Sequence, residues 1–443
     1  MMLAITLLCL GTIASLQSEF PPSNIAYPDI LFGSKTPYFV AQGDDLNKLQ
    51  DHEIIQIFGI FRHGTRNPSE DDNNDMKVLN NIKKNIGSKA KISSNDRQAI
   101  KNWVNLAEKN KNLIDQGKID MEHLATRLRN NFPSIFTNKF NSAIHKVLSS
   151  NEERAKDSAV YFLQNAFPDT KIKKKNVPAW EDNDVTLNID KLREKLRQNK
   201  NKNNPDSEVN KFLNGDKMKK TIINVTELLN YNSTFNYKDV KAMYEACRHD
   251  YTRNIEMSMN SKPAWCRVFT KDDLLNLEYL DDLIWNEKFG YNSHYGDKLG
   301  CPLIMRIKMS FEAAISNPTV KAVLNFGHRS NLFPTFTMLG LAYDETRLSA
   351  DNMDNMSNRR WRTSFLNPFS ANTILILSKF NNKFYVSVFV NENIVDLTIE
   401  NNKTCEICEW SQFEKKLNNF ILKHNSNNHE NNGCNFGFNI TLP

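Results

Sequence analysis

Two arginines flank a histidine directly after an apolar stretch, and these residue types together could do chemistry on a phosphate group. The segment reads Arg62-His63-Gly64-Thr65-Arg66-Asn67-Pro68. The apolar residues 54–61 before it predict a buried strand that ends in a loop, and ligand sites in open α/β sheets lie at the carboxyl ends of strands. Arginine binds phosphate oxygens in bidentate fashion, and histidine can attack phosphorus. The segment therefore predicts a phosphate pocket with its own nucleophile, His63; a basic surface turn is the alternative.

The pattern Arg-His-Gly-x-Arg-x-Pro resembles the signature of the histidine phosphatase superfamily, in the branch that contains acid phosphatases and phytases. The resemblance implies that His63 attacks phosphorus and becomes a transient phosphohistidine. It also implies that Arg62 and Arg66 hold the phosphoryl oxygens during this attack.

Three further segments resemble the same branch and occur in its order along the chain. The segment around Lys35 is similar to the N-terminal segment of the multiple inositol polyphosphate phosphatases, and Lys35 is a candidate contact to a second phosphate. The segment around Arg154 resembles the one that supplies a third phosphate arginine. His328, after a predicted strand at 319–327, resembles the second active-site histidine. The alternatives are that Lys35 is a solvent-exposed lysine, that Arg154 only forms a salt bridge, and that His328 is an ordinary histidine without a catalytic role. The resemblance covers about residues 25–435.

The chain departs from this branch after the second histidine, where relatives usually carry a carboxylic acid as His-Ala-Glu or His-Asp. This chain has His328-Arg329-Ser330. A positioned acid contributes about 10²–10⁴-fold to rate, and an arginine cannot supply a proton at working pH. Three outcomes stay open: another carboxylate, such as Asp344 or Glu345, substitutes; the enzyme is slow or needs good leaving groups; or turnover is lost. Arg329 is then a fourth basic contact for a polyanionic ligand, or an exposed residue at a helix start.

The strands and helices expected around these residues indicate an α/β fold. We expect a central mixed β-sheet flanked by helices and a mostly α-helical cap. Strands are expected at about 50–61 and 319–327, and alternating apolar residues at 373–378 and 383–390 predict a hairpin. A helical pattern runs through 141–167.

The composition changes between about residues 170 and 300, where a polar, basic run at 192–202 precedes helical patterns at 209–229 and 240–258. We expect the basic run to be a solvated helix face or loop; attraction of a phosphorylated substrate is the alternative. The expected organisation is a signal peptide at 1–18, an α/β phosphatase core at 19–168 and 301–443, and an α-helical cap insertion at 169–300.

Residues 1–18 are apolar and predict a secretory signal peptide, although a basic residue is missing from its start. No other apolar run reaches the length of a membrane span, so none is expected. Secretion follows, with lysosomal delivery as the alternative. Five Asn-x-Ser/Thr sites predict glycosylation: Asn224, Asn232, Asn355, Asn402 and Asn439.

Beyond Cys9 in the predicted signal peptide, the cysteines are Cys247, Cys266, Cys301, Cys405, Cys408 and Cys434. An even count in a secreted chain predicts three disulfides. The resemblance to the family implies the pair Cys247–Cys266, and the other pairings stay open. The Cys405-x-x-Cys408 spacing is also typical of metal and redox sites, but structural bonding is favoured in an exported chain.

The net charge of +6 suits a small anionic substrate and does not require nucleic acid. The chain shows no glycine-rich phosphate loop and no ligand clusters of a two-metal phosphatase, so we expect no cofactor and no metal; the oligomeric state stays open. The resemblance implies a secreted phosphomonoesterase that acts on inositol polyphosphates, with His328 donating a hydrogen bond to a phosphoryl oxygen. The alternative is a secreted protein that binds a small ligand in a former active site; mutase-type transfer is less favoured because the chain is exported.

Overall fold

The computed structural model describes residues 30–105, 111–181, 184, 186–197, 207–426 and 434. The predicted signal peptide, residues 1–18, lies outside the described residues. No helix in the described part of the chain combines the length and the apolarity needed to cross a membrane.

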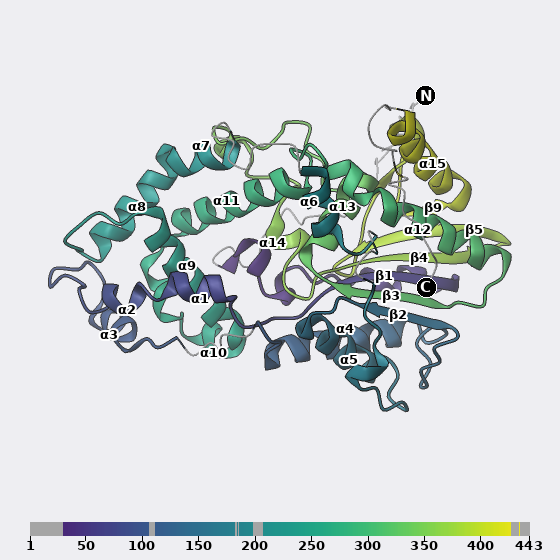
Figure 1. The fold of residues 1–443 in the computed structure, drawn as a ribbon, viewed down its shortest axis with the longest axis horizontal. Coiled ribbons are helices and arrows are strands. Elements are labelled where there is room, and N and C mark those ends of the chain that lie inside the picture. The colour runs from purple at the N-terminus through teal and green to yellow at the C-terminus, as the bar shows by residue number, and fades with distance from the viewer. Residues whose placement is uncertain are drawn as a thin grey trace, which may run out of the picture.

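A seven-stranded mixed β-sheet forms one half of the molecule (Figure 1). Its strand order is β2-β3-β1-β4-β5-β6, and β9 pairs with β5. The first three strands of this order are parallel, and the other pairings are antiparallel. The strands are β1 (Glu53–Arg62), β2 (His145–Ser149), β3 (Ala322–Gly327), β4 (Asn372–Phe380), β5 (Lys383–Val390), β6 (Asn393–Ile394) and β9 (Ile407–Glu409); β7 (Leu397–Thr398) and β8 (Thr404–Cys405) form a separate ladder. This architecture confirms the predicted mixed α/β fold.

The predicted strands β1 and β3 and the predicted β4–β5 hairpin are all present. Asn381 and Asn382 form the two-residue hairpin turn with φ of 46° and 62°. A two-residue turn of this kind needs left-handed backbone at both positions, and asparagine tolerates that conformation better than most residues. The turn therefore fixes the register that the alternating apolar residues indicate.

The helix predicted across 141–167 is wrong in its first part. Residues His145–Ser149 form strand β2, which pairs with β3 in parallel, and only then does helix α5 (Glu153–Ala166) begin. Burial alternates along β2, with Val147 buried and its two neighbours only partly buried. The spacing of Ile144 and Val147 resembled a helical period, but sheet pairing decides the conformation of so short a segment.

Helices cover both faces of the sheet (Figure 1). Alternate residues of β1 supply the two cores: Ile57 and Phe61 pack toward α4 (Asp115–Asn131) and α5, and Phe58 and Ile60 pack toward the opposite side. The opposite side is covered by α12 (Gly296–Ser316), α13 (Arg329–Leu339) and α15 (Trp410–Ser426). Because β1 is central and buried on both faces, it reads as a continuous apolar run.

A helical half lies beside the sheet (Figure 1). The two predicted helical stretches are present, but each is divided, at Gly215 and at Asn254. Segments from outside 169–300 also join this half, because α1 packs against α9. Its helices are α1 (Glu70–Met76), α2 (Leu79–Ile82), α3 (Ser94–Asn102), α7 (Glu208–Asn214), α8 (Asp216–Leu228), α9 (Tyr237–Arg253), α10 (Ile255–Asn260) and α11 (Lys271–Phe289).

Two short helices, α6 (Ile189–Arg197) and α14 (Thr363–Leu366), lie between the two halves (Figure 1). The basic run predicted as solvated begins in α6, and residues 198–206 lie outside the described residues. Within α6, Lys191 and Lys195 are exposed, whereas Arg193 packs over the Phe289 ring and its Nε donates to the Lys288 carbonyl. Short 3₁₀ turns occur at Gly33–Lys35, Tyr38–Val40, Asp45–Leu49, Lys174–Asn176, Ala264–Val268, Met353–Asn355 and Glu400–Asn402.

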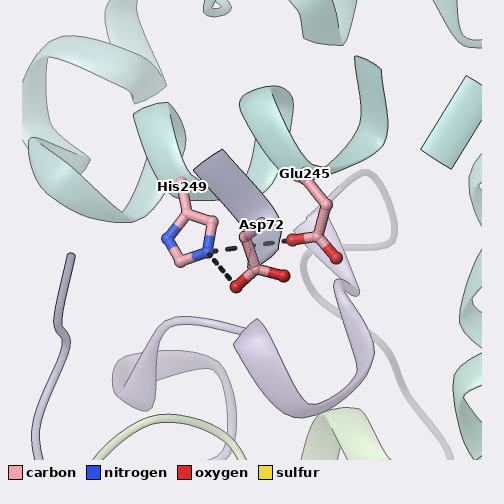
Figure 2. Close-up of side chains that lie close together, drawn as sticks. All are labelled: Asp72, Glu245 and His249. Carbon is pink, nitrogen blue, oxygen red and sulfur yellow. Dashed lines mark ion pairs between the residues drawn. The ribbon is translucent and has the colours of Figure 1, made fainter. Parts of the chain in front are cut away.

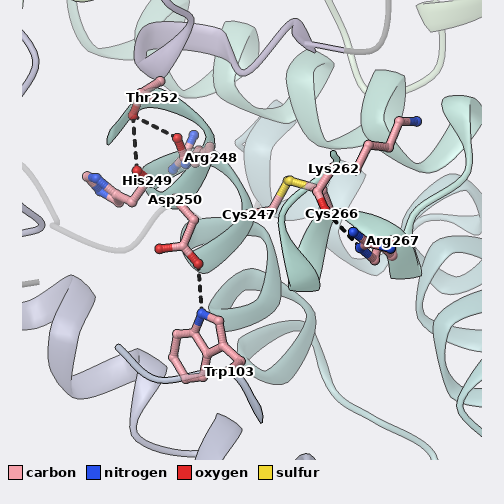
Figure 3. Close-up of a disulfide and its surroundings, with 9 residues drawn as sticks. All are labelled: Trp103, Cys247, Arg248, His249, Asp250, Thr252, Lys262, Cys266 and Arg267. Carbon is pink, nitrogen blue, oxygen red and sulfur yellow. Dashed lines mark hydrogen bonds between the residues drawn. A yellow bond between two sulfur atoms is a disulfide. The ribbon is translucent and has the colours of Figure 1, made fainter. Parts of the chain in front are cut away.

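Three disulfides join Cys247 to Cys266, Cys301 to Cys434 and Cys405 to Cys408. The expected pair Cys247–Cys266 is confirmed, and it ties α9 to the 3₁₀ turn that follows α10 (Figure 3). Beside it, Trp103 Nε1 donates to Asp250 Oδ2 at 2.7 Å, which anchors the end of α3 to the same helix.

The predicted glycosylation sites differ in exposure. The side chains of Asn232, Asn355 and Asn402 are exposed, as a glycan requires. Asn224 is partly buried and its Nδ2 donates to Asp273 Oδ1 at 3.2 Å, so this site is the least accessible of the four. Asn439 lies outside the described residues.

Candidate active site

The ends of three adjacent parallel strands bring the predicted site residues together. Arg62 at the end of β1 pairs with Gly327 at the end of β3, so His63 and His328 follow neighbouring strand ends. The backbone N–H of His63 donates to the Gly327 carbonyl at 3.0 Å, and the two imidazole centroids lie 5.6 Å apart. On the other side of β3, strand β2 leads into α5, whose first turn carries Arg154.

The loop that carries His63 packs without a gap against α4 and α5. The Gly64 N–H donates to Ser158 Oγ at 3.0 Å, and this hydroxyl donates to the Arg154 carbonyl at 2.7 Å. A Cβ on Gly64 would lie only 2.4 Å from the Gly117 carbonyl oxygen of α4. Any side chain at position 64 would therefore push the loop off the helix, and this explains the glycine beside the histidine.

The His63 imidazole is buried and oriented by its own loop. Its Nδ1 lies 2.8 Å from the Gly64 carbonyl oxygen, which can only accept a hydrogen bond, so Nδ1 carries the proton and Nε2 has the lone pair. Burial, and then the charges of Arg154 and Arg62, hold the pKa of His63 well below its usual range. The ring is therefore neutral at mildly acidic pH, and Nε2 is available as a nucleophile.

Arginine side chains surround the two histidines. Arg62 Nη1 donates to the Ser34 and Asn367 carbonyl oxygens, and Arg154 Nη1 pairs with the exposed Glu152 at 2.7 Å. Burial, and after it the other arginines, hold the pKa of Arg62 well below its usual range. Burial likewise lowers the pKa of Arg66, to about 10. The site thus concentrates positive charge, which is costly unless an anion is bound.

Three buried polar atoms of this pocket find no hydrogen-bond partner among the described residues. They are Arg62 Nε, Arg154 Nε and His328 Nδ1. Buried polar atoms without a partner are uncommon in folded proteins and call for an explanation. Burial and the neighbouring arginines also hold the pKa of His328 well below its usual range, so this ring is neutral as well.

Neither residue after His328 offers a carboxylate to the pocket. The Arg329 guanidinium stacks 3.9 Å above the centre of the Trp285 ring, and its Nη1 donates to Ser34 Oγ at 3.1 Å. Of the two alternatives for Arg329, the structure therefore does not have the one in which the side chain points at solvent. Asp344 accepts hydrogen bonds from the backbone amides of residues 360 and 361, and Glu345 is exposed.

Lys35, a candidate phosphate contact, forms ion pairs with two members of a cluster that has metal-ligand spacing. Figure 2 shows the three members of this cluster, Asp72, Glu245 and His249. The ligand atoms of Asp72, Glu245 and His249 lie within 4.8 Å of one another, and they form the one such group in the part of the chain that the structure describes. The Lys35 ammonium forms ion pairs with both carboxylates, and Arg248 forms a second one with Glu245. Because side-chain cations already balance these acids, the cluster fits an internal salt bridge better than a metal.

The sequence did not indicate one carboxylate that lies beside the loop carrying His63. Asp120 on α4 accepts hydrogen bonds from Thr65 Oγ at 3.3 Å and Ser370 Oγ at 3.4 Å, and the Ser370 N–H donates to the His63 carbonyl. Burial raises the pKa of Asp120 to about 6. Nothing in the local sequence marks this aspartate, because both of its hydroxyl partners are distant in the chain.

Comparison with known proteins over most of the chain agrees with the family resemblance of the sequence motifs. The family model of the histidine phosphatase superfamily, branch 2, matches residues 53–391. Multiple inositol polyphosphate phosphatase 1 of Drosophila melanogaster is 26% identical over 416 residues, covering 87% of this chain and 84% of that protein. The Homo sapiens protein of the same name is 26% identical over 410 residues, covering 83% and 82%.

Solved structures show the same fold. The phytase from D. castellii superposes with a TM-score of 0.72 at 15% identity, covering 93% of this chain and 90% of that one. The Bifidobacterium longum multiple inositol polyphosphate phosphatase in complex with inositol hexasulfate gives a TM-score of 0.64 at 14% identity, covering 88% and 97%. With its motif, its fold and the match over most of its length, the chain belongs to branch 2 of the histidine phosphatase superfamily, the histidine acid phosphatases.

Proposed function

We propose that the chain is a secreted histidine-type phosphatase that removes phosphate from small phosphomonoesters, with inositol polyphosphates as the favoured substrates. Family membership makes it a phosphomonoester hydrolase, and relatives named multiple inositol polyphosphate phosphatase support the substrate class. The observation that carries the proposal is a neutral, oriented His63 imidazole within a pocket of buried arginines.

The proposed phosphate contacts are Arg62, Arg66, Arg154 and His328, with Arg329 at the edge of the pocket. The unpartnered Arg62 Nε, Arg154 Nε and His328 Nδ1 support this assignment, because phosphate oxygens would give these atoms partners. Lys35 is not among the proposed contacts to the reacting phosphate, because two carboxylates already hold its ammonium group.

In the proposed reaction, His63 Nε2 attacks phosphorus in line with the leaving oxygen and forms a phosphohistidine. The arginines stabilise the charge on the phosphoryl oxygens, and His328 donates a hydrogen bond to one of them. Such preorganised charge stabilisation is usually the largest catalytic contribution. Water then hydrolyses the phosphohistidine and regenerates the free imidazole.

Export is the second part of the proposal. It is supported by the predicted signal peptide at 1–18 and by three disulfides, which persist in oxidising compartments. Secretion and delivery to lysosomes are both consistent with these features. Finding the protein with its N-terminus unprocessed in the cytosol of its own cells would contradict this part.

The test compares the wild type with His63→Ala for phosphate release from inositol hexakisphosphate and from 4-nitrophenyl phosphate at mildly acidic pH. We expect release from both esters by the wild type and none above background by the variant. His123→Ala, which removes an exposed histidine from α4, is the matched control and should keep full activity. Equal release by the wild type and His63→Ala would refute turnover at this site.

A second candidate function follows from the replacement of the usual acid by Arg329. The protein would then bind a small anionic ligand in the pocket and release no product. Calorimetric titration with inorganic phosphate and with inositol hexasulfate distinguishes the two functions. Binding of either anion by a wild type that hydrolyses neither test ester would favour the binding protein, and turnover of either ester would exclude it.

A further inference from the structure

An alkyl phosphate needs a proton for its leaving oxygen, and the segment after His328 contains no acid to supply it. Arg329 is held by Trp285 and Ser34, as described above. The next side chain, Ser330, is buried, and its hydroxyl donates to Asp190 Oδ2 at 2.7 Å. A carboxylate from another helix therefore reaches the second position after the histidine.

The position of Asp190 relative to His328 is fixed by a second, parallel connection. The His328 N–H donates to Asn331 Oδ1 at 2.9 Å, and Asn331 Nδ2 donates to the Leu187 carbonyl at 2.6 Å, directly before α6. Helix α6 packs against α13, as Figure 1 also shows, and the buried side chain of Ile189 anchors its first turn in the core. The start of α6 and the His328 loop are thus joined as one unit.

Four other acids make their hydrogen bonds and ion pairs with other segments and not with the residues that follow His328. Asp281 Oδ2 accepts from the Ser34 N–H at 2.7 Å, and Asp72 pairs with Lys35. Asp120 accepts hydrogen bonds from the Thr65 and Ser370 hydroxyl groups, and Asp344 accepts from the backbone amides of residues 360 and 361. Asp190 combines contact with the His328 loop and exposure to solvent.

Two cations of the same region, Arg329 and Lys288, respond to nearby acids. Burial lowers the pKa of both side chains, and the negative charge of Asp281, and after it that of Asp190, acts against this lowering. The Lys288 Nζ also lies 4.9 Å from the centre of the Trp285 ring that Arg329 covers.

We propose that Asp190, positioned by Ser330, is the acid that protonates the leaving oxygen; this rests on the proposed phosphatase function. In the first step, His63 Nε2 bonds to phosphorus, the bond between phosphorus and the ester oxygen breaks, and that oxygen takes the proton of the Asp190 carboxyl group. In the second step, the Asp190 carboxylate takes a proton from the attacking water, the phosphorus–nitrogen bond breaks, and phosphate leaves. Both side chains return to their starting states.

The experiment measures kcat of Asp190→Asn on an alkyl ester, glycerol phosphate, and on 4-nitrophenyl phosphate, whose leaving group needs little protonation. We expect a fall of about 100-fold on the alkyl ester and of less than about 3-fold on the aryl ester. Asp190→Glu should recover part of the alkyl activity, and Ser330→Ala should lower it in the same selective way but less. Glu194→Gln, an exposed acid on the same helix, is the matched control and should change neither rate.

A merely structural role for Asp190 would lower both rates together, so an unchanged alkyl-to-aryl ratio in Asp190→Asn would overturn the assignment. Unchanged rates on both esters would overturn it as well. A wild type that binds inorganic phosphate in calorimetry but hydrolyses neither ester would overturn the phosphatase function itself, and with it the role of Asp190. Hydrolysis of 4-nitrophenyl phosphate by the wild type shows that the phosphatase function holds, so a failure of the Asp190 assignment can then be recognised separately.

Discussion

Two regions of this protein bury arginines, and they differ in whether carboxylates balance the positive charge. Between α11 and the segment before α14, Arg359 and Arg362 meet Glu278 and Asp282 in a buried cluster. Each carboxylate also accepts a hydrogen bond from the α14 segment, Asp282 from the Thr363 N–H at 2.7 Å and Glu278 from a serine hydroxyl. In this cluster two carboxyl groups face two guanidinium groups, so the positive charge is balanced.

The proposed phosphate site has no such balance, and within the described part of the chain the one ion pair of its arginines joins Arg154 to the exposed Glu152. Arg62, Arg66, Arg154 and Arg329 converge on two neutral histidines, and buried nitrogen atoms are left without partners among the described residues. Buried charges that are paired can remain in a folded protein without a ligand. Buried charges of one sign that are not paired are costly, and a bound ligand of opposite charge lowers that cost. The comparison separates a structural network from a binding site without reference to any motif.

Removing an arginine from the unbalanced site should cost activity and not stability. Arg154→Met is expected to lower kcat/KM for 4-nitrophenyl phosphate by about 10²–10³-fold, because one donor to the transition state is lost. The free energy of unfolding in urea should stay unchanged or rise, since repulsion among the arginines is relieved. Lys156→Met, on the same helix, is the control. A large loss of stability with little loss of activity would reverse the comparison.

Removing an acid from the balanced cluster should do the opposite. Glu278→Gln leaves Arg359 and Arg362 with one carboxylate, and breaking a buried ion pair costs about 3–5 kcal/mol. Urea unfolding should show this loss, while kcat/KM per folded molecule stays near the wild-type value. Asp272→Asn, at the exposed start of the same helix, should change stability by less than about 1 kcal/mol. Loss of activity without loss of stability would place this cluster in the catalytic machinery.

Much of the sheet could be predicted, because β1, β3 and the β4–β5 hairpin are marked by local apolar runs and by an asparagine turn. Strand β2 could not, since only Val147 and Leu148 among its five residues are apolar, which is too weak a pattern. At the site, His63 and its arginines lie within one short segment and follow a strong strand. Ser330 and Asp190 are 140 residues apart, so their contact depends on how the helices pack.

The unbalanced pocket also predicts a stability response to anions. Inorganic phosphate at 100 times its dissociation constant should raise the free energy of unfolding by about 2.7 kcal/mol, because it binds only the folded protein. Thermal denaturation should show this for the wild type and for Glu278→Gln, but much less for Arg154→Met. An equal response in all three proteins would mean that phosphate binds away from the pocket.

The smallest expected effect concerns Asp120, the acid behind the nucleophile loop. Its pKa is raised to about 6 in the folded protein, so its contribution to stability is present below about pH 4 and is lost as the pH rises through 6. Partial exposure of the side chain reduces this contribution to about 1 kcal/mol.

Asp120→Asn should therefore flatten the fall in unfolding free energy between pH 4 and 7, which urea titrations at several pH values measure. Asp115→Asn, an exposed acid on the same helix, should leave this slope unchanged. Asp120 lies between the balanced cluster and the unbalanced site, because hydrogen bonds from Gln116, Thr65 and Ser370, and after them the charge of Arg127, compensate its burial only in part. An unaltered slope in Asp120→Asn would show that solvent reaches this carboxylate freely, and that only the arginines carry the charge imbalance of the site.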